Sequence, residues 1–229
     1  MNKSGPNLGF STVETATAIR WADEARTSRH RLYPTTVVYA LVTALALAFA
    51  LRSAPRIGAA SWMAGVLFWT WAEYMVHRFV LHGVFPDGPG LKHVLHKLFD
   101  HLHVEHHQRP WDGNHINGTI KDTSPFLGPV FLLALLLPPH TLLAFLAGFT
   151  QAYVVEEWVH HSVHFYHFDN LYFRYIKRHH LYHHSRVGAE RGYGLTSGGW
   201  DVVYGTRFPA DVRAALYESL RRSSSPHAG

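Results

Sequence analysis

Long apolar runs alternate with polar, histidine-rich stretches along the 229 residues of the chain. The first run, Tyr33–Leu51, holds no charged residue over a length close to the roughly 20 residues that a membrane-spanning helix needs. A short break at residues 52–56 separates it from a second run, Ile57–Val76, whose single acid is Glu73. The pattern predicts two membrane crossings joined by a tight turn.

A second apolar pair follows later in the chain. Residues 125–137 are apolar, Pro138 and Pro139 interrupt the run, and residues 141–155 are apolar again. Because each arm is shorter than an ideal span, the pattern predicts a helical hairpin that forms either two short crossings or a re-entrant pair. Residues 83–124, between the two pairs, are rich in Gly, Pro, Asp and His, so we expect them to fold as a cytoplasmic cap.

The two ends of the chain are polar. We expect residues 1–31 to form a cytoplasmic arm that includes a short amphipathic helix around Val13–Arg26. A last helix is predicted from about Ala210 to Arg222, and the tail at 223–229 is predicted to be disordered.

Charge and composition narrow the possible functions. The formal charge of +5 includes basic residues beside apolar runs, such as the four arginines between residues 20 and 31. Lys177 and Arg178 lie beside the last histidine cluster in the same way. Basic residues in such places indicate the cytoplasmic face of a membrane, and we expect no nucleic-acid partner. The chain has no cysteine, so any metal must bind nitrogen and oxygen ligands.

Half of the 20 histidines gather in four clusters, each at or just beyond an apolar segment. The clusters are His77/His82, His103/His106/His107, His160/His164 and His180/His183/His184. Imidazole fills an apolar core poorly but is the commonest neutral ligand of borderline metal ions. Ten rings exceed the needs of one ion, so the clusters predict a centre with two ions, for which Fe(II), Zn(II) and Mn(II) all suit the ligands.

Helical spacing predicts how the rings are presented. Three clusters have i, i+3 or i, i+4 spacing, which points the rings the same way from one helix face. His77 and His82 are five apart, about 140° on an ideal helix. Either the helix unwinds near His82, helped by Gly83, or the two rings approach the centre from different sides.

Four carboxylates are candidates for orienting the histidine ligands through hydrogen bonds. We expect Glu73 to pair with His77, one turn on. Glu156 and Glu157 lie one turn before His160 and either orient a ring through its second nitrogen or stay solvated at the interface. Asp201 is the fourth candidate.

The order HxxxxH, HxxHH, HxxxH, HxxHH over about residues 65–207 resembles the fatty acid hydroxylase and sterol desaturase superfamily of integral-membrane di-iron oxygenases. EYMVHRFVLH, HVEHHQRPWD and YIKRHHLYHHSRVGAERGYGLTSGGWDVVYGT are similar to the catalytic domain of fatty acid 2-hydroxylases. The resemblance implies an all-α, four-helix membrane bundle under a His-rich cytosolic helical cap, with residues 32–222 as the catalytic domain. It also implies that the ten histidines bind two ions, iron or, in purified protein, zinc.

The activity that the resemblance implies is O2-dependent hydroxylation of a lipid acyl chain, by similarity at carbon 2. Because many eukaryotic 2-hydroxylases carry a fused cytochrome b5 domain where this chain has a short arm, we expect a separate electron donor of cytochrome b5 or ferredoxin type. The resemblance leaves sterol oxidase, sterol desaturase and carotenoid hydroxylase activities open.

A metal transporter is the alternative from another class. A transporter places polar ligands midway through its crossings, whereas Val37–Leu51 and Phe126–Leu137 offer none and the histidines collect at the ends. A zinc hydrolase would need a carboxylate base, and the HExxH motif is absent. The sequence therefore favours a multi-pass membrane oxygenase with its histidine clusters on the cytoplasmic side.

Overall fold

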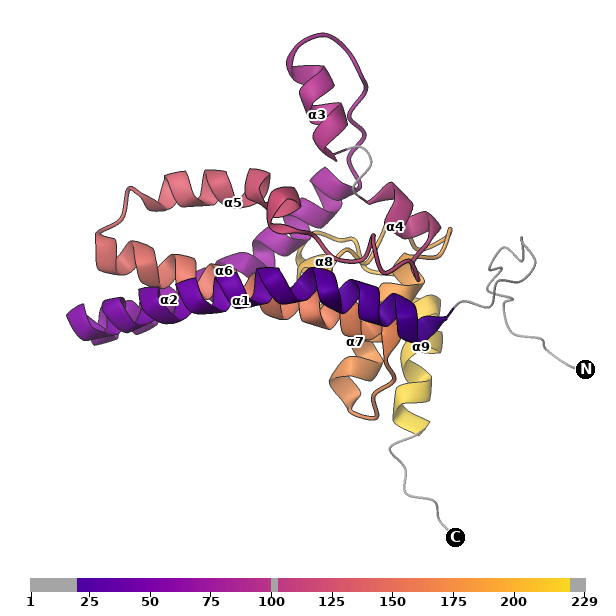
Figure 1. The fold of residues 1–229 in the computed structure, drawn as a ribbon. Coiled ribbons are helices and arrows are strands. Elements are labelled where there is room, and N and C mark those ends of the chain that lie inside the picture. Colours follow the sequence, from indigo (N-terminus) through magenta and orange to yellow (C-terminus); the bar gives the residue numbers. More distant parts are fainter. Residues whose placement is uncertain (1–19, 100–102, 223–229) are drawn as a thin grey trace, which may run out of the picture.

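A computed structural model describes residues 20–99 and 103–222, and these residues form helices and loops without a strand. The all-α prediction is thereby confirmed for the described part of the chain. The helices, shown in Figure 1, are α1 (Trp21–Ser53), α2 (Pro55–Met75), the π-helix η1 (Val76–Leu81), α3 (Leu91–Phe99), α4 (Val104–Gln108), α5 (Ile120–Ala134), α6 (Pro139–Phe165), α7 (Leu171–His183), α8 (Gly199–Val203) and α9 (Ala210–Arg222). The predicted disordered tail at 223–229 and most of the predicted arm lie outside the described residues.

Helix α1 joins the expected arm to the first apolar run without a break. It begins at Trp21 and continues through Pro34, so the expected boundary at residue 31 falls inside a helix of 33 residues. Contacts made by its first turns explain the early start: Ala25 and Ser28 are buried, and the Glu24 carboxylate accepts a hydrogen bond from Gly113 N–H at 2.9 Å. Among the described helices, α1 alone is both long and apolar enough by composition to cross a membrane.

Two glycines let α2 and α6 approach closely. A Cβ added at Gly65 would lie 2.0 Å from the Phe145 carbonyl oxygen, and one added at Gly148 would lie 2.0 Å from that of Trp62. Beyond this crossing Trp69 packs edge-on against Phe149, with ring centroids 5.0 Å apart. The close crossing holds the end of α2 beside the end of α6, and both ends carry candidate metal ligands.

The predicted hairpin is present as α5 and α6, with Pro138 and Pro139 at the turn. Pro139 is the first residue of α6, a position where a missing N–H costs nothing. The arms are unequal, with 15 residues in α5 and 27 in α6. Helix α6 therefore carries the fourth apolar run onward to His160 and His164, as predicted. The last helix, α9, has the predicted bounds.

Candidate metal centre

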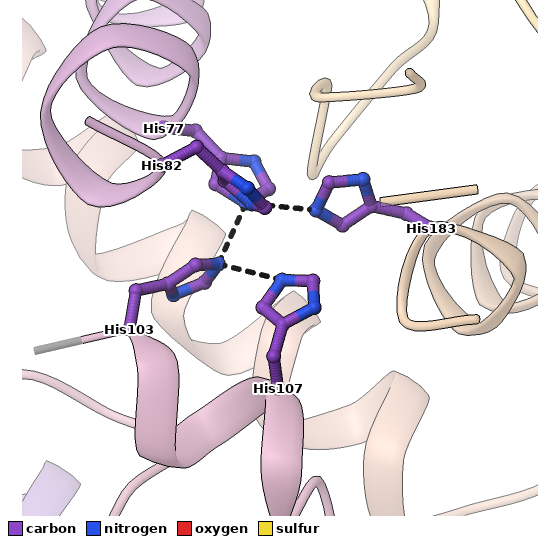
Figure 2. Close-up of side chains that lie close together, drawn as sticks. All are labelled: His77, His82, His103, His107 and His183. Carbon is purple, nitrogen blue, oxygen red and sulfur yellow. Dashed lines mark hydrogen bonds between the residues drawn. The ribbon is translucent and has the colours of Figure 1, made fainter. Parts of the chain in front are cut away.

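The structure brings the ten predicted histidines together as two compact groups of five. Group 1 contains His77, His82, His103, His107 and His183. Group 2 contains His106, His160, His164, His180 and His184. Within each group one ring nitrogen per residue lies within 4.8 Å of all the others, so each group could hold a metal ion. Figure 2 shows the rings of group 1 converging from three separate stretches of the chain.

A π-helical turn resolves the spacing of His77 and His82. Helix α2 widens into η1, which ends with His82 as its C-cap, and the His82 N–H donates to the His77 carbonyl at 3.1 Å, an i to i+5 bond. The wider turn sets the two rings side by side, with centroids 5.0 Å apart. A π-helical turn is uncommon and often occurs at functional sites. Ideal α-helical geometry could not predict this arrangement.

Each HxxHH unit divides its rings between the two groups. In α4 and its N-cap, His103 and His107 belong to group 1 and His106 to group 2. In α7 and its C-cap the assignment is reversed: His180 and His184 belong to group 2, and His183 to group 1. In each unit the two histidines at i and i+4 thus belong to one group, and the histidine at i+3 belongs to the other. The prediction that all three rings of a unit point the same way holds only for the i, i+4 pairs.

The two groups are neighbours. The rings of His107, in group 1, and His184, in group 2, are stacked with centroids 4.3 Å apart. His103 and His106, one from each group, have centroids 5.2 Å apart. The arrangement can therefore place two ions close together.

The nitrogen separations within each group fit metal coordination better than hydrogen bonding. Nε2 atoms lie 2.9 Å apart for His77 and His103 and 3.0 Å apart for His82 and His183. Two nitrogens at about 2.1 Å from one ion lie about 3.0 Å apart at a right angle and about 3.4 Å apart at the tetrahedral angle. The observed separations match neighbouring positions around one cation.

Group 2 shows the same short separations between ring nitrogens, and here they form a longer series. His164 Nε2 lies 3.2 Å from His160 Nε2 and 2.8 Å from His180 Nε2, which itself lies 3.0 Å from His184 Nε2. A neutral ring nitrogen either donates one proton or accepts one, so a chain of short contacts among identical atoms cannot be satisfied by hydrogen bonds alone. A cation at their centre would satisfy all of these lone pairs.

Backbone carbonyls fix the orientation of two rings in group 1. His77 Nδ1 donates to the Tyr193 carbonyl at 2.5 Å, and His183 Nδ1 donates to the Arg191 carbonyl at 2.7 Å. A proton on Nδ1 leaves the lone pair on Nε2, the atom that faces the group. Gly192, between the two carbonyls, has φ of +68°, a value that favours glycine. Sequence reasoning missed both carbonyls, since no side-chain pattern reports them.

Burial keeps the rings neutral and ready to coordinate. Burial, reinforced by the neighbouring rings, lowers the pKa of His183 to about 3, and burial lowers that of His82 to about 4. The pKa of His106 is lowered well below its usual range for the same reason. Neutral imidazole is the form that binds metal.

Glu73 and Asp201 hold the glycine-rich loop at residues 192–198 rather than a ring. Glu73 accepts hydrogen bonds from Leu195 N–H at 2.6 Å and from Thr196 N–H at 2.9 Å. The expected pairing of Glu73 with His77 is wrong, because the loop takes the carboxylate while both nitrogens of the ring have other partners. Asp201 accepts from Tyr193 N–H at 2.9 Å. Both acids therefore act on the loop whose Tyr193 carbonyl orients His77.

The two adjacent acids on α6 have separate surroundings, and neither hydrogen-bonds a histidine ring among the described residues. Glu157 accepts from the Asn117 side-chain amide at 2.7 Å. Asn117 in turn accepts from Ser28, whose hydroxyl lies 2.7 Å from His161 Nδ1. The predicted alternative of solvated acids is also wrong, since Glu156 is 5% exposed and Glu157 8% exposed.

A cavity of about 470 Å³ adjoins both groups. His77 and His103 of group 1 and His160 of group 2 lie in its wall. Most of the other lining comes from α2, α5 and α6 and from the loop before α5, and includes Trp69, Glu73, Leu127, Tyr153, Glu156 and Glu157. A space with apolar helices on one side and candidate metal ligands on the other can hold an apolar chain against a metal centre.

Other histidines near the clusters have partners of their own. His93 contacts Asp87 at 2.8 Å, and His179 lies 3.4 Å from Asp201. His96 contacts the Phe85 carbonyl at 2.7 Å. His101 lies outside the described residues.

Comparisons with known proteins show which family and which relatives the chain is similar to. The model of the family described as "Fatty acid hydroxylase" matches residues 62–206. A dihydroceramide fatty acyl 2-hydroxylase of Arabidopsis thaliana is 37% identical over 143 residues, which are 62% of this chain and 58% of that protein. A fatty acid 2-hydroxylase of Mus musculus is 29% identical over 154 residues, 66% of this chain and 40% of that protein. The chain thus spans roughly half the length of these relatives.

A solved structure of full-length scs7p, in which only the hydroxylase domain is visible, has a similar fold. It aligns with a TM-score of 0.70 at 27% identity, covering 79% of this chain and 67% of that chain.

Proposed function

The chain belongs to the fatty acid hydroxylase family, and from this we propose that it is a membrane enzyme that hydroxylates a lipid acyl chain at carbon 2, using a dinuclear metal centre held by histidines. The observation that carries the proposal is the pair of five-histidine groups beside one cavity. Relatives named as fatty acid and dihydroceramide fatty acyl 2-hydroxylases support the position on the chain.

Group 1 and group 2 would each hold one ion, iron in the working enzyme, with zinc able to occupy the same nitrogens in purified protein. Five imidazoles leave one further position in a six-coordinate site. Two bound iron ions would supply the activation of O2 that an unactivated C–H bond requires and that no side chain provides. Overall, one oxygen atom enters the C–H bond and the other leaves as water, which consumes two electrons and two protons. A separate donor of cytochrome b5 or ferredoxin type would deliver the electrons.

The side chains of the protein bind, orient and exclude water. The cavity would take the acyl chain with its reacting carbon toward His77, His103 and His160. The Tyr193 and Arg191 carbonyls hold His77 and His183 in the tautomer that presents Nε2 to the centre. Buried packing around both groups keeps bulk water from the site of oxidation.

We propose that α1 crosses the membrane, that α2 and the α5–α6 hairpin are embedded beside it, the hairpin either as two short crossings or as a re-entrant pair, and that the remaining helices cap them on the cytoplasmic side. Apolar side chains exposed on these helices support this placement, among them Leu45 at 74%, Leu67 at 60% and Leu133 at 66%. Such surface is unusual in a soluble protein and ordinary in a bilayer. The catalytic unit would comprise residues 32–222 together with the first turns of α1.

No observation favours the alternatives. The relatives reported above are named as hydroxylases of fatty acids and fatty acyl groups. The ten rings lie together at one end of the long helices, whereas a transport path would need ligands along them.

The test is to express the chain with an electron donor and analyse the host lipids for a gain of one oxygen atom and its position. We expect 2-hydroxylated acyl chains from the wild-type protein and none from His160→Ala or His183→Ala, which remove one ring from each group. His140→Ala, at the opposite end of α6, is the matched control and should keep activity. Helicity and metal content of each variant separate loss of the centre from loss of the fold. Wild-type product from either ring variant, or oxidation at another position, would overturn the proposal.

A further inference from the structure

We propose that α3 is a surface anchor whose apolar face docks into the headgroup region of an anionic lipid bilayer. The inference rests on the membrane placement proposed above but not on the metal chemistry. Figure 1 shows α3 projecting away from the body of the molecule, across the direction of α1, α2 and α6. If those helices cross the bilayer, a helix so oriented near their histidine-bearing end lies along the membrane surface.

The sequence of α3 presents a narrow apolar face. At about 100° per residue, Val94, Leu91 and Leu95 fall within an arc of about 100°. Leu91 is 71% exposed and Val94 is 48% exposed, whereas Leu95, at one edge of the arc, is half-buried. Val84, in the loop before the helix, is 83% exposed and adds to the apolar surface.

The opposite side of α3 is tied to the preceding loop. His93 Nδ1 lies 2.8 Å from an Asp87 carboxylate oxygen, and His96 Nδ1 lies 2.7 Å from the Phe85 carbonyl oxygen. On the helical wheel these two histidines lie on either side of the direction opposite the apolar arc. The loop thereby fixes the rotation of the helix and turns its apolar face outward.

Two lysines make an anionic bilayer the fitting partner. Lys92 and Lys97 lie about 60° beyond the two edges of the apolar arc. Both are exposed, and neither makes an ion pair within residues 20–99 and 103–222. Lysines flanking an apolar face lay their stems along apolar surface and extend their ammonium groups to lipid phosphates. Each such lysine shifts the docking equilibrium toward an anionic surface by a factor on the order of five.

A helix of nine residues would bind a membrane weakly as a free peptide. In this protein α3 is attached to helices proposed to be embedded in the bilayer. The attachment keeps α3 close to the membrane surface, so docking needs little affinity of its own. The loop that links α3 to the rest of the chain starts directly after His82, at the edge of group 1. Docking would hold this connection at the lipid boundary.

The absence of cysteine permits a direct test with single labels. Val94→Cys is labelled with an environment-sensitive fluorophore on the full chain in vesicles that contain anionic phospholipid. Asp211→Cys, exposed at the start of α9, is the aqueous control. We expect blue-shifted emission at position 94, strong quenching by lipids brominated on the acyl chain and weak quenching by iodide, with the reverse pattern at position 211.

The same labelled protein tests the contribution of the two lysines and the identity of the surface that covers α3. Adding Lys92→Gln and Lys97→Gln should reduce the lipid quenching severalfold in anionic vesicles and by less in zwitterionic vesicles. Aqueous behaviour at position 94 would overturn the proposal. A lipid-like signal that appears only at high protein density would also overturn it and would point to a second copy of the chain. Because the readout is independent of hydroxylation, an inactive enzyme with a docked α3 remains distinguishable from an active enzyme with a free α3.

Discussion

Replacing Asp201 by asparagine should loosen the loop that orients His77. The Asp201 side chain is 1% exposed. One oxygen accepts from Tyr193 N–H at 2.9 Å and from the Thr206 hydroxyl at 2.7 Å, and the other accepts from Gly194 N–H at 3.1 Å. In Asp201→Asn the amide carbonyl can keep the first two donors. The amide NH2 then faces Gly194 N–H, which is left without an acceptor.

The loss should amount to one hydrogen bond to a buried charged acceptor, about 1.5–3 kcal/mol. Donation from the new amide to His179, which lies 3.4 Å from the same carboxylate oxygen, would not restore the acceptor for Gly194. For a chain of this size, about 2 kcal/mol lowers the Tm by roughly 4–8 °C.

Glu73→Gln is the matched control, because Glu73 is also buried and holds the same loop. Its carbonyl can keep both backbone donors, from Leu195 and Thr196. Its new NH2 faces the Thr196 hydroxyl, which donates to the carboxylate at 2.7 Å in the wild type and can turn to accept. Both variants replace a buried carboxyl group by an amide of the same size, so the difference between them reports on the unpaired Gly194 N–H. We expect Glu73→Gln to cost less than about 1 kcal/mol.

The assay is thermal unfolding of both variants in the same detergent, with hydrogen exchange at Gly194 and metal titration. Asp201→Asn should unfold at a lower temperature than Glu73→Gln and exchange faster at Gly194. It should also bind metal in group 1 about 10–100-fold more weakly, because the Tyr193 carbonyl no longer holds His77. Equal Tm values, or unchanged metal binding with fast exchange at Gly194, would refute the link between this acid and the ring.

Three further predictions follow from the same geometry. Although burial opposes ionisation, hydrogen bonds from His179 and Thr206 hold the pKa of Asp201 below the usual 3.8, so its stabilisation is present above that pH and is lost as the pH falls through the lower folded value. The difference in unfolding free energy between wild type and Asp201→Asn should therefore shrink as the pH falls from about 4 through the lower folded pKa in urea titrations, and a constant difference would contradict the assignment. Leu127→Trp, in the cavity wall, should lower turnover of long acyl substrates while metal content stays unchanged, and loss of metal would show that the cavity is not separable from the centre. His107→Ala and His184→Ala should each weaken metal binding in one group, seen as loss of about half the bound metal by elemental analysis, whereas loss of all metal from either variant would mean that the groups do not bind independently.

Much of the site could be predicted from the chain alone, because histidine is seldom placed in repeated helical spacing for packing reasons. The four clusters named all ten rings that the structure gathers into two groups. The helical class and the bounds of α9 also followed from local patterns of apolar and polar residues. These features depend on neighbours within one or two turns, which the sequence displays directly.

Other features depended on contacts between distant segments. The division of each HxxHH unit between groups depends on where η1, α6 and the partner unit lie, and the widening of α2 into a π-helix has no signal in a spacing rule. Glu73 has His77 one turn away in sequence, yet it binds a loop more than 120 residues further on.

The sequence by itself therefore determined which side chains can bind metal and which segments are apolar enough for helices in a membrane. Only the tertiary structure decided how the rings are shared between the two groups, which carbonyls orient them and what each buried acid holds. The physical reason is that ligand chemistry belongs to single residues. The direction of a ring and the partner of a buried charge are set by whichever distant backbone packs against them.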